Sequence, residues 1–151
     1  MRLRLKYESP VLKYPLTIRL DFALGEKPAE VVTSPVIRKF PLVFFPLISH
    51  LGPEEILAEK IRALLVRGKG RDLFDCWFLL GKGIKINPLL LRKKMGEINQ
   101  KFTKKLLEKR IAEYSSRDLR LDLDRFLPGP QRKITPLLKQ LLLEKIAPSK
   151  L

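Results

Sequence analysis

The chain has 151 residues, 45% of them hydrophobic, and its 31 lysines and arginines outnumber 16 acidic residues to give a formal net charge of +15. This composition excludes a disordered chain, and one cysteine (Cys76) with one histidine (His50) excludes an internal disulfide and a cysteine–histidine zinc site. The positive charge favours a polyanionic partner such as nucleic acid, a nucleotide or an acidic protein, or else a solvated surface suited to high temperature or solubility.

The first 50 residues are predicted to form strands, because apolar and polar side chains alternate along them. The segments RLRLKY (residues 2–7) and YPLTIRLDFAL (residues 14–24) both have the period of a half-buried strand. Asp21 lies on the polar side of the second segment. Residues 31–50 are rich in β-branched and aromatic side chains but contain prolines, which cannot donate to a sheet ladder. We therefore expect short, interrupted or edge strands there.

Helices are predicted from residue 51 onward. The segment HLGPEEILAEKIRALLVRG has Pro53 and two acids near its first turn and a glycine at its end, which are helix start and stop signals. The tight basic turn GKGRD follows. After it, DLFDCWFLLGKG (residues 72–83) is predicted as a short helix that two glycines close.

The remaining residues continue the helical pattern. Residues 88–114 are predicted as one long basic helix, residues 117–127 as an extended segment because they alternate, and residues 135–148 as a final amphipathic helix. Strands followed by helices indicate an α+β fold. The whole chain is predicted as a single domain, with the strands in residues 1–50 and the helices in residues 51–151.

The first predicted helix carries a lysine near its buried side. At 100° per residue, Lys60 falls inside the margin of the apolar stripe and Arg67 lies two turns along on the same side. The stripe consists of Ile56, Leu57, Ile61 and Leu64, and the solvent face carries Glu55, Glu59 and Arg62. A lysine at such a margin either extends its ammonium group to water or belongs to a polar site.

The second predicted helix is apolar almost all round, which is typical of a buried helix, yet it carries Asp72 and Asp75 on one side. Asp72 suits a first-turn cap, and either Arg67 or Arg71 would satisfy Asp75 structurally. If the turn sets the two helices antiparallel, however, Lys60 faces both acids.

Such a cluster suits phosphate chemistry. The cations of Arg67, Lys69 and Arg71 can hold phosphate oxygens, and carboxylates can hold a divalent metal such as Mg²⁺ or orient a basic group. Asp21 can add a third carboxylate from its strand. The GKG turn also exposes backbone amides, although it lacks the P-loop pattern.

The order of these residues resembles a known family. The stretch EEILAEKIRALLVRGKGRDLFDCWFLL closely resembles the signature of the AbiEii/AbiGii toxins, which are nucleotidyltransferase-like toxins of abortive-infection type IV toxin–antitoxin systems. In that family a hydrophobic-Asp-hydrophobic strand precedes an acid-acid-x-x-Ala-x-Lys helix and an Arg-Asp-x-x-Asp helix. IRLDFAL matches at Asp21, EEILAEK at Lys60, and GRDLFD at Asp72 and Asp75. The resemblance covers residues 14–82 well.

The resemblance implies a polymerase-β-like nucleotidyltransferase fold, with a short N-terminal sheet followed by a helical bundle. It implies transfer of a nucleotide from a nucleoside triphosphate to an RNA such as tRNA, with Mg²⁺ bound beside the triphosphate. Carried over, Asp21 matches a metal-binding carboxylate, Lys60 the lysine near the triphosphate, and Asp72, with Asp75 in support, the acid of the Arg-Asp motif. An antitoxin is the expected partner.

The sequence departs from the family pattern in one respect. The family's first motif, Gly-Ser followed by Asp-x-Asp, is expected upstream of Asp21, and this chain has no Gly-Ser. We therefore expect the chain to correspond to the C-terminal two-thirds of the catalytic domain. It is then incomplete and inactive alone, or complemented by a chain that carries the missing carboxylate pair.

Two other functions stay open. Basic residues recur across residues 92–110 and can bind phosphate backbones without sequence preference, or simply be solvated. An exposed sheet edge and the proline-rich segment 34–50 can contact a partner protein or a second copy. No apolar run is long enough to span a membrane and no signal peptide is evident, so a cytoplasmic location is predicted.

Overall fold

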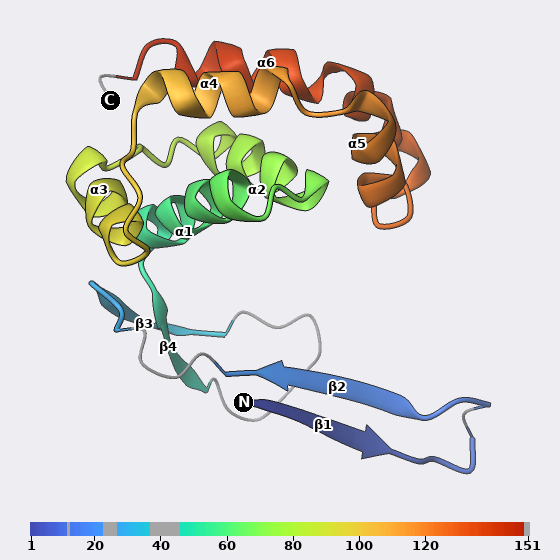
Figure 1. Ribbon diagram of the computed structural model, residues 1–151. Coiled ribbons are helices and arrows are strands. Elements are labelled where there is room, and N and C mark those ends of the chain that lie inside the picture. Colours follow the sequence, from blue (N-terminus) through green and yellow to red (C-terminus); the bar gives the residue numbers. More distant parts are fainter. Residues whose placement is uncertain (12, 23–26, 37–45, 150–151) are drawn as a thin grey trace.

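The computed structural model describes residues 1–11, 13–22, 27–36 and 46–149. It has an α+β arrangement, with strands first and helices after them, which confirms the predicted fold class (Figure 1). The described strands form two separate antiparallel pairs instead of one short sheet. The first pair is β1 (Arg2–Tyr7) with β2 (Leu16–Asp21), and the second is β3 (Val31–Pro35) with β4 (Leu47–Leu51).

The β1–β2 hairpin confirms the predicted alternation but exposes its apolar side. In the register of the pair, Leu3 lies opposite Leu20, and Leu5 opposite Ile18. All residues of both strands are exposed, and Tyr7 at the end of β1 is 63% exposed. Residues 23–26, over which the alternation is predicted to continue and turn, lie outside the described residues. The hairpin therefore has an amphipathic form without a described element covering its apolar face.

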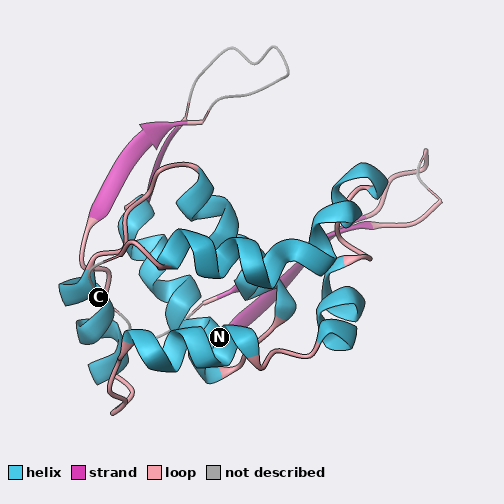
Figure 2. Cartoon of the chain, turned by 90° about the horizontal axis from the view of Figure 1, so that it is seen from above, coloured by secondary structure: helices cyan, strands magenta, loops and turns pink. Residues whose placement is uncertain are grey.

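The helical part begins directly after β4. Its elements are α1 (Pro53–Val66), α2 (Gly70–Gly81), α3 (Pro88–Gly96), α4 (Lys104–Ala112), α5 (Ser116–Leu123), the 3₁₀ helix η1 (Gly129–Leu137) and α6 (Leu138–Ile146). Figure 1 shows α4 and α6 above α1 and α2, and Figure 2, seen from above, shows the helices gathered in one group. Within the described residues, no helix is long and apolar enough to cross a membrane.

The hydrophobic core lies entirely between the helices. Its most buried side chains come from α1 to α6 and are Leu57, Ile61, Leu64, Leu73, Cys76, Leu91, Met95, Leu107, Ile111, Leu119, Leu123, Leu138, Leu142 and Ile146. They recur at helical spacing on each element, so burial of one side of every helix stabilises the bundle. The free thiol of Cys76 is part of this core, and burial raises its pKa.

The predicted long helix over residues 88–114 is wrong, because two helices, α3 and α4, occupy it. Asn99 adopts a left-handed conformation with φ 56°, which asparagine tolerates better than most residues and which a continuous helix excludes. The Thr103 side chain then accepts a hydrogen bond from the Leu106 amide and caps the start of α4.

The predicted extended segment over residues 117–127 is also wrong, because α5 begins at Ser116. The Ser115 side chain accepts a hydrogen bond from the Asp118 amide, which is a helix cap. Leu119 and Leu123 are buried at helical spacing, whereas Leu121 between them is 63% exposed. The leucines at 119, 121 and 123 fit the two-residue period of a strand, and the first and last of them also fit the period of a helix. Packing of this segment against α2 favours the helix.

Candidate functional site

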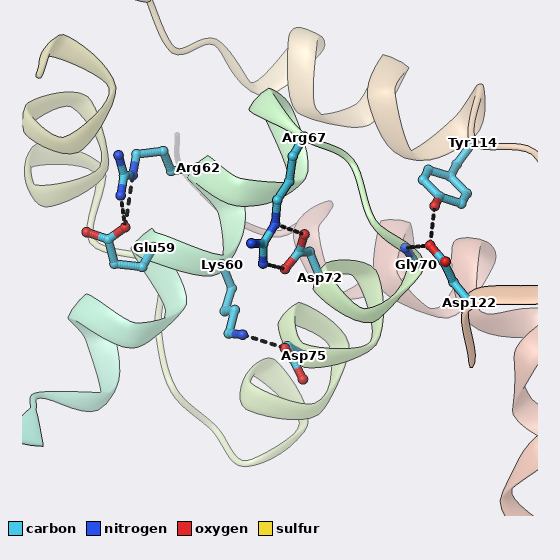
Figure 3. A network of polar contacts seen from close by, with 9 residues as sticks. All are labelled: Glu59, Lys60, Arg62, Arg67, Gly70, Asp72, Asp75, Tyr114 and Asp122. Atoms are coloured by element: carbon cyan, nitrogen blue, oxygen red, sulfur yellow. Dashed lines mark hydrogen bonds and ion pairs between the residues drawn. The ribbon is translucent and has the colours of Figure 1, made fainter. Parts of the chain in front are cut away.

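The turn between α1 and α2 depends on two glycines that approach other helices closely. Gly68 has φ +57°, and a Cβ there would collide with the guanidinium of Arg110, which donates to the carbonyl of Leu64 at 3.3 Å. Gly70 lies against α5, and its amide donates to Oδ2 of Asp122 at 2.8 Å (Figure 3). The prediction that the GKG turn exposes its backbone amides is therefore wrong at Gly70, whose N–H is hydrogen-bonded to the Asp122 carboxylate.

Asp122 anchors this turn with a second hydrogen bond. The hydroxyl of Tyr114 donates to the same Oδ2 atom at 3.1 Å. The bond from the Gly70 amide lowers the pKa of Asp122, and burial raises the pKa of Tyr114 to about 12. The two glycines and this carboxylate set α1 and α2 side by side, in the antiparallel arrangement that the sequence predicts (Figure 1).

The helix hairpin brings the predicted lysine and acids together in two ion pairs. Nζ of Lys60 lies 2.7 Å from Oδ2 of Asp75, and both side chains are about one-third exposed (Figure 3). Arg67 donates to both oxygens of Asp72, at 3.0 and 2.8 Å. This bidentate bond raises the pKa of Arg67. Lys60, rather than Arg67 or Arg71, is thus the partner of Asp75.

A pocket of about 340 Å³ opens beside these pairs. It is lined by Glu59, Lys60, Arg62, Ala63, Val66 and Arg67 of α1 and by Ile98 from the connection between α3 and α4. Three of these side chains are cationic, and the one acid, Glu59, already accepts from Arg62 at 2.8 Å. Lys60 and Arg67 are likewise held by Asp75 and Asp72, so the pocket presents three cations that a ligand would share with these carboxylates.

Arg62 is a pocket residue that helical spacing alone places on the solvent face. Its guanidinium lies 2.6 Å from Oε2 of Glu59, and its side chain is only 19% exposed. Arg67 lines the same pocket and lies on the Lys60 side of the helix, as the helical spacing predicts, and Ala63 also lines the pocket.

Glu55 was expected on the solvent face and is instead completely buried. Oε1 of Glu55 lies 2.6 Å from Nζ of Lys94, a residue of α3 that is itself 3% exposed. The backbone amides of Ala29 and Glu30 donate to the same carboxylate at 2.8 to 2.9 Å. Burial alone would raise the pKa of Glu55, but these hydrogen bonds outweigh it and lower the pKa.

Lys94 connects this buried pair to the pocket. Its Nζ also lies 2.9 Å from Oε1 of Glu59, which in turn holds Arg62. The sequence contains one signal for it, because Lys94 lies between Leu91 and Met95 on the apolar side of its helix. A lysine in that position needs an acidic partner, but nothing local identifies Glu55 as that partner.

The remaining predicted site residues lie away from the ion pairs. Arg71 packs on the ring of Phe126, 5.0 Å from its centroid, and Lys69 is exposed at the start of α2. Asp21 pairs with Arg2 and Arg19 on the β1–β2 hairpin, and the hydrogen bond from Arg2 lowers its pKa. The structure therefore does not bring Asp21 to Lys60.

The carboxylates of the described chain do not fit a magnesium site. Asp21 lies on β2, whereas Asp72 and Asp75 lie on α2, and each of the three carboxylates is paired with a different cation. Among residues 1–11, 13–22, 27–36 and 46–149, no group of three possible ligands comes together. A hard cation needs several oxygen ligands at once, so these side chains alone cannot supply them.

The predicted basic face over residues 92–110 is not continuous. Lys94 is buried, Lys104 donates to the carbonyls of Ala147 and Ser149 at the end of α6, and Arg110 donates to α1. Basic side chains thus satisfy the free carbonyls at helix ends, where the helix dipole also favours them.

Comparison with known proteins places this chain in a family. A model of the AbiEii family, described as nucleotidyl transferase AbiEii toxin of the type IV toxin–antitoxin system, matches residues 1–145. The chain belongs to the AbiEii family. The match extends beyond the predicted residues 14–82 to the strands and helices on either side. No curated protein and no solved structure gives a significant match.

Membership of the AbiEii family confirms the resemblance seen in the helix-hairpin motif. The family's description makes a nucleotidyltransferase-like toxin of a toxin–antitoxin system the function class and implies an antitoxin partner. The polymerase-β-like fold and the roles of individual residues are not part of that description and stay predictions.

Proposed function

We propose that the chain is a nucleotidyltransferase toxin that moves a nucleotide from a nucleoside triphosphate to RNA, with the pocket on α1 as its triphosphate site. The observation that carries this proposal is the set of Lys60, Arg62 and Arg67 around one opening. Phosphate oxygens are bound by such cations, and guanidinium groups bind them with two parallel hydrogen bonds. The net charge of +15 also attracts both polyanionic substrates.

The ion pairs suit this role because they hold the cations in place without burying them. Asp75 fixes the ammonium of Lys60 at the pocket edge, and Asp72, which is 1% exposed, fixes the guanidinium of Arg67. Lys60 would neutralise charge that develops on the triphosphate during transfer. Asp72 and Asp75 are therefore proposed as positioning residues.

We also propose that magnesium is brought by the triphosphate, since phosphate oxygens supply many of its ligands in nucleotide complexes. The described carboxylates do not form a metal site, so no step of the reaction is assigned to them through the metal. Arg67, Lys69 and Arg71 were predicted as cofactor-binding residues. Of these, Arg67 lines the pocket, whereas Lys69 and Arg71 lie at the start of α2 and are not among its lining residues.

The proposed transfer predicts labelled RNA in a direct assay. The purified chain, both alone and mixed with a chain that carries a Gly-Ser and Asp-x-Asp segment, is incubated with tRNA, magnesium and each of the four nucleoside triphosphates carrying a labelled α-phosphate. We expect radioactivity in the RNA with at least one nucleotide, and its loss when a chelator is added, because the metal is needed to neutralise the phosphates. Absence of label in RNA and in protein with every nucleotide would show that the chain has no such activity.

A second candidate function, binding of a protein partner, is favoured by the β1–β2 hairpin. The face that no described element covers carries Leu3, Leu5, Tyr7, Leu16, Ile18 and Leu20, which are 36–63% exposed. Exposed apolar surfaces of this kind mark sites of association. The occupant that we propose is an acidic partner, the antitoxin of the system, because the opposite face carries Arg2, Arg4 and Arg19 and two copies of a chain with charge +15 repel one another.

Partner binding through this hairpin predicts a response to charge at its apolar face. We expect Ile18→Lys to abolish association with the antitoxin, measured by sedimentation of the mixed proteins, because it places an ammonium in the contact. Thr17→Lys, on the opposite face, is the matched control and should sediment as the wild type does. A chain that self-associates alone, with Ile18→Lys restoring a monomer, would instead identify a second copy as the occupant.

A further inference from the structure

The exposed side of α2 combines aromatic rings with cations. At about 100° per residue, Arg71, Phe74, Phe78 and Lys82 share one side of the helix. Phe78 is 46% exposed, its ring is stacked on that of Phe74 with centroids 6.3 Å apart, and Nζ of Lys82 lies 5.3 Å from its centroid. The expectation that this helix is buried all round is therefore wrong on this side.

A groove of about 530 Å³ runs beside these rings. It is lined by Phe74, Trp77 and Phe78 of α2 and by Pro130, Gln131, Lys133, Ile134 and Leu137 of η1. None of these described lining residues is acidic. The side chains of Lys82 and Lys133 form no ion pair or hydrogen bond with any residue between 46 and 149 or in the other described ranges.

A second exposed ring, which Arg71 contacts from the same side of α2, repeats the combination. Phe126 is 53% exposed, and the guanidinium groups of Arg71 and Arg125 lie 5.0 and 4.8 Å from its centroid. Exposed aromatic rings and cations together bind nucleotides well, because bases stack on rings and on guanidinium groups while the cations attract the phosphates. An acidic protein would also be attracted by these cations, but exposed rings combined with cations suit bases and phosphates together.

We propose that this groove, defined by Phe74, Trp77, Phe78 and Lys133, binds unpaired nucleotides of single-stranded RNA. The proposal deepens the proposed function and rests on it in one respect, namely that the bound RNA is the acceptor. Asp75, the partner of the pocket residue Lys60, follows Phe74 directly in α2, so the groove and the pocket both belong to the α1–α2 hairpin. The groove would then hold the acceptor while the pocket holds the triphosphate.

The test measures binding of fluorescein-labelled oligouridine of about 12 nucleotides by anisotropy, a length that one such groove can cover. We expect Phe78→Ala to weaken binding about tenfold, since base stacking on one ring contributes on the order of 1–3 kcal/mol. The control is Tyr14→Ala on the β1–β2 hairpin, which removes another exposed ring beside a cation, Lys13, at 5.7 Å. Its affinity should match that of the wild type.

A second variant tests the cations and does not depend on the aromatic residues. Lys82→Ala combined with Lys133→Ala should reduce the slope of log affinity against log salt concentration by about 0.7 for each phosphate that the protein no longer neutralises. Both lysines are at the surface, so circular dichroism should show the wild-type fold. If Phe78→Ala does not fold, this variant alone decides whether the groove binds RNA.

Unchanged oligouridine affinity and salt slope in the lysine variant would overturn the proposal, as would equal losses in Phe78→Ala and Tyr14→Ala. A wild-type chain that binds no oligouridine but forms oligomers that Phe78→Ala disrupts would show that the groove holds protein. A different set of results would show that the proposed nucleotide transfer is wrong although the groove does bind RNA. In that case oligouridine binds through the groove, yet no nucleotide is transferred and Lys60→Met does not alter any nucleotide affinity.

Discussion

Replacing Lys94 by methionine is expected to lower the free energy of unfolding by about 3–5 kcal/mol, because it leaves a buried carboxylate without its charged partner. Glu55 is completely buried and Lys94 is 3% exposed, so water cannot take the place of the ammonium. Methionine has a similar volume, so the loss reflects charge and not a cavity. Guanidinium denaturation at neutral pH, followed by circular dichroism, measures the change.

The neighbouring residue provides the control. Lys93 lies in the same helix and is exposed, so Lys93→Met should change stability by no more than about 0.5 kcal/mol. Adding Glu55→Gln to Lys94→Met should recover part of the loss, because the unpaired charge is then removed. Equal stability of the two methionine variants would contradict a structural role for the buried pair.

The pair also predicts a pH dependence. The folded protein lowers the pKa of Glu55 below its ordinary value of 4.5, so its contribution is present above that pH and is lost as the pH falls through the lowered pKa. Lys94, whose pKa is raised from 10.5, contributes at all lower pH values. In Lys94→Met the uncompensated burial of Glu55 favours its protonated form, so the deficit relative to wild type should shrink as the pH falls from neutral towards 4.5.

Replacing Lys60 by methionine is expected to reduce the rate of nucleotide transfer about 100-fold or more, because one preorganised charge at the reacting phosphates contributes that much in comparable sites. Stability should change far less. The Lys60–Asp75 pair is about one-third exposed, and such pairs contribute only about 0–1 kcal/mol. Transfer assays and denaturation of the same preparation separate the two effects.

Two further measurements identify the role of Lys60. If its ammonium contacts the triphosphate, Lys60→Met should weaken binding of a triphosphate more than binding of the nucleoside, because only the phosphates lose a partner. Lys93→Met, which removes a charge outside the pocket, should transfer nucleotide as the wild type does. Wild-type transfer by Lys60→Met would show that the hairpin is structural and that the pocket serves another purpose.

Local signals in the chain predicted much of this fold correctly. The alternation over Leu16–Asp21 and the start signals around Pro53 depend on neighbouring residues alone, so the strand and α1 follow from the sequence. The same logic failed over residues 117–127, where leucines fit both a strand and a helix. There the cap at Ser115 and burial of Leu119 and Leu123 decided the outcome.

In the candidate site, too, some contacts follow from the local sequence and others do not. Lys60 and Asp75 were predicted to meet because only a short turn separates their helices, and the structure places them 2.7 Å apart. Their catalytic role stays a prediction. Helical spacing places Glu55 on the solvent face and misses its burial, because this spacing relates a residue only to its own helix and not to the element packed against it.

The order of residues along the chain was enough to predict strands before helices, the helix hairpin with its lysine and acids, and membership of a toxin family. It did not predict which cations are available to a ligand. Lys94 is buried against Glu55, Lys104 and Arg110 bind helix carbonyls, and Lys82 and Lys133 face solvent beside aromatic rings. These differences arise because packing between distant segments sets the partner of each lysine, and no local pattern of residues records that packing.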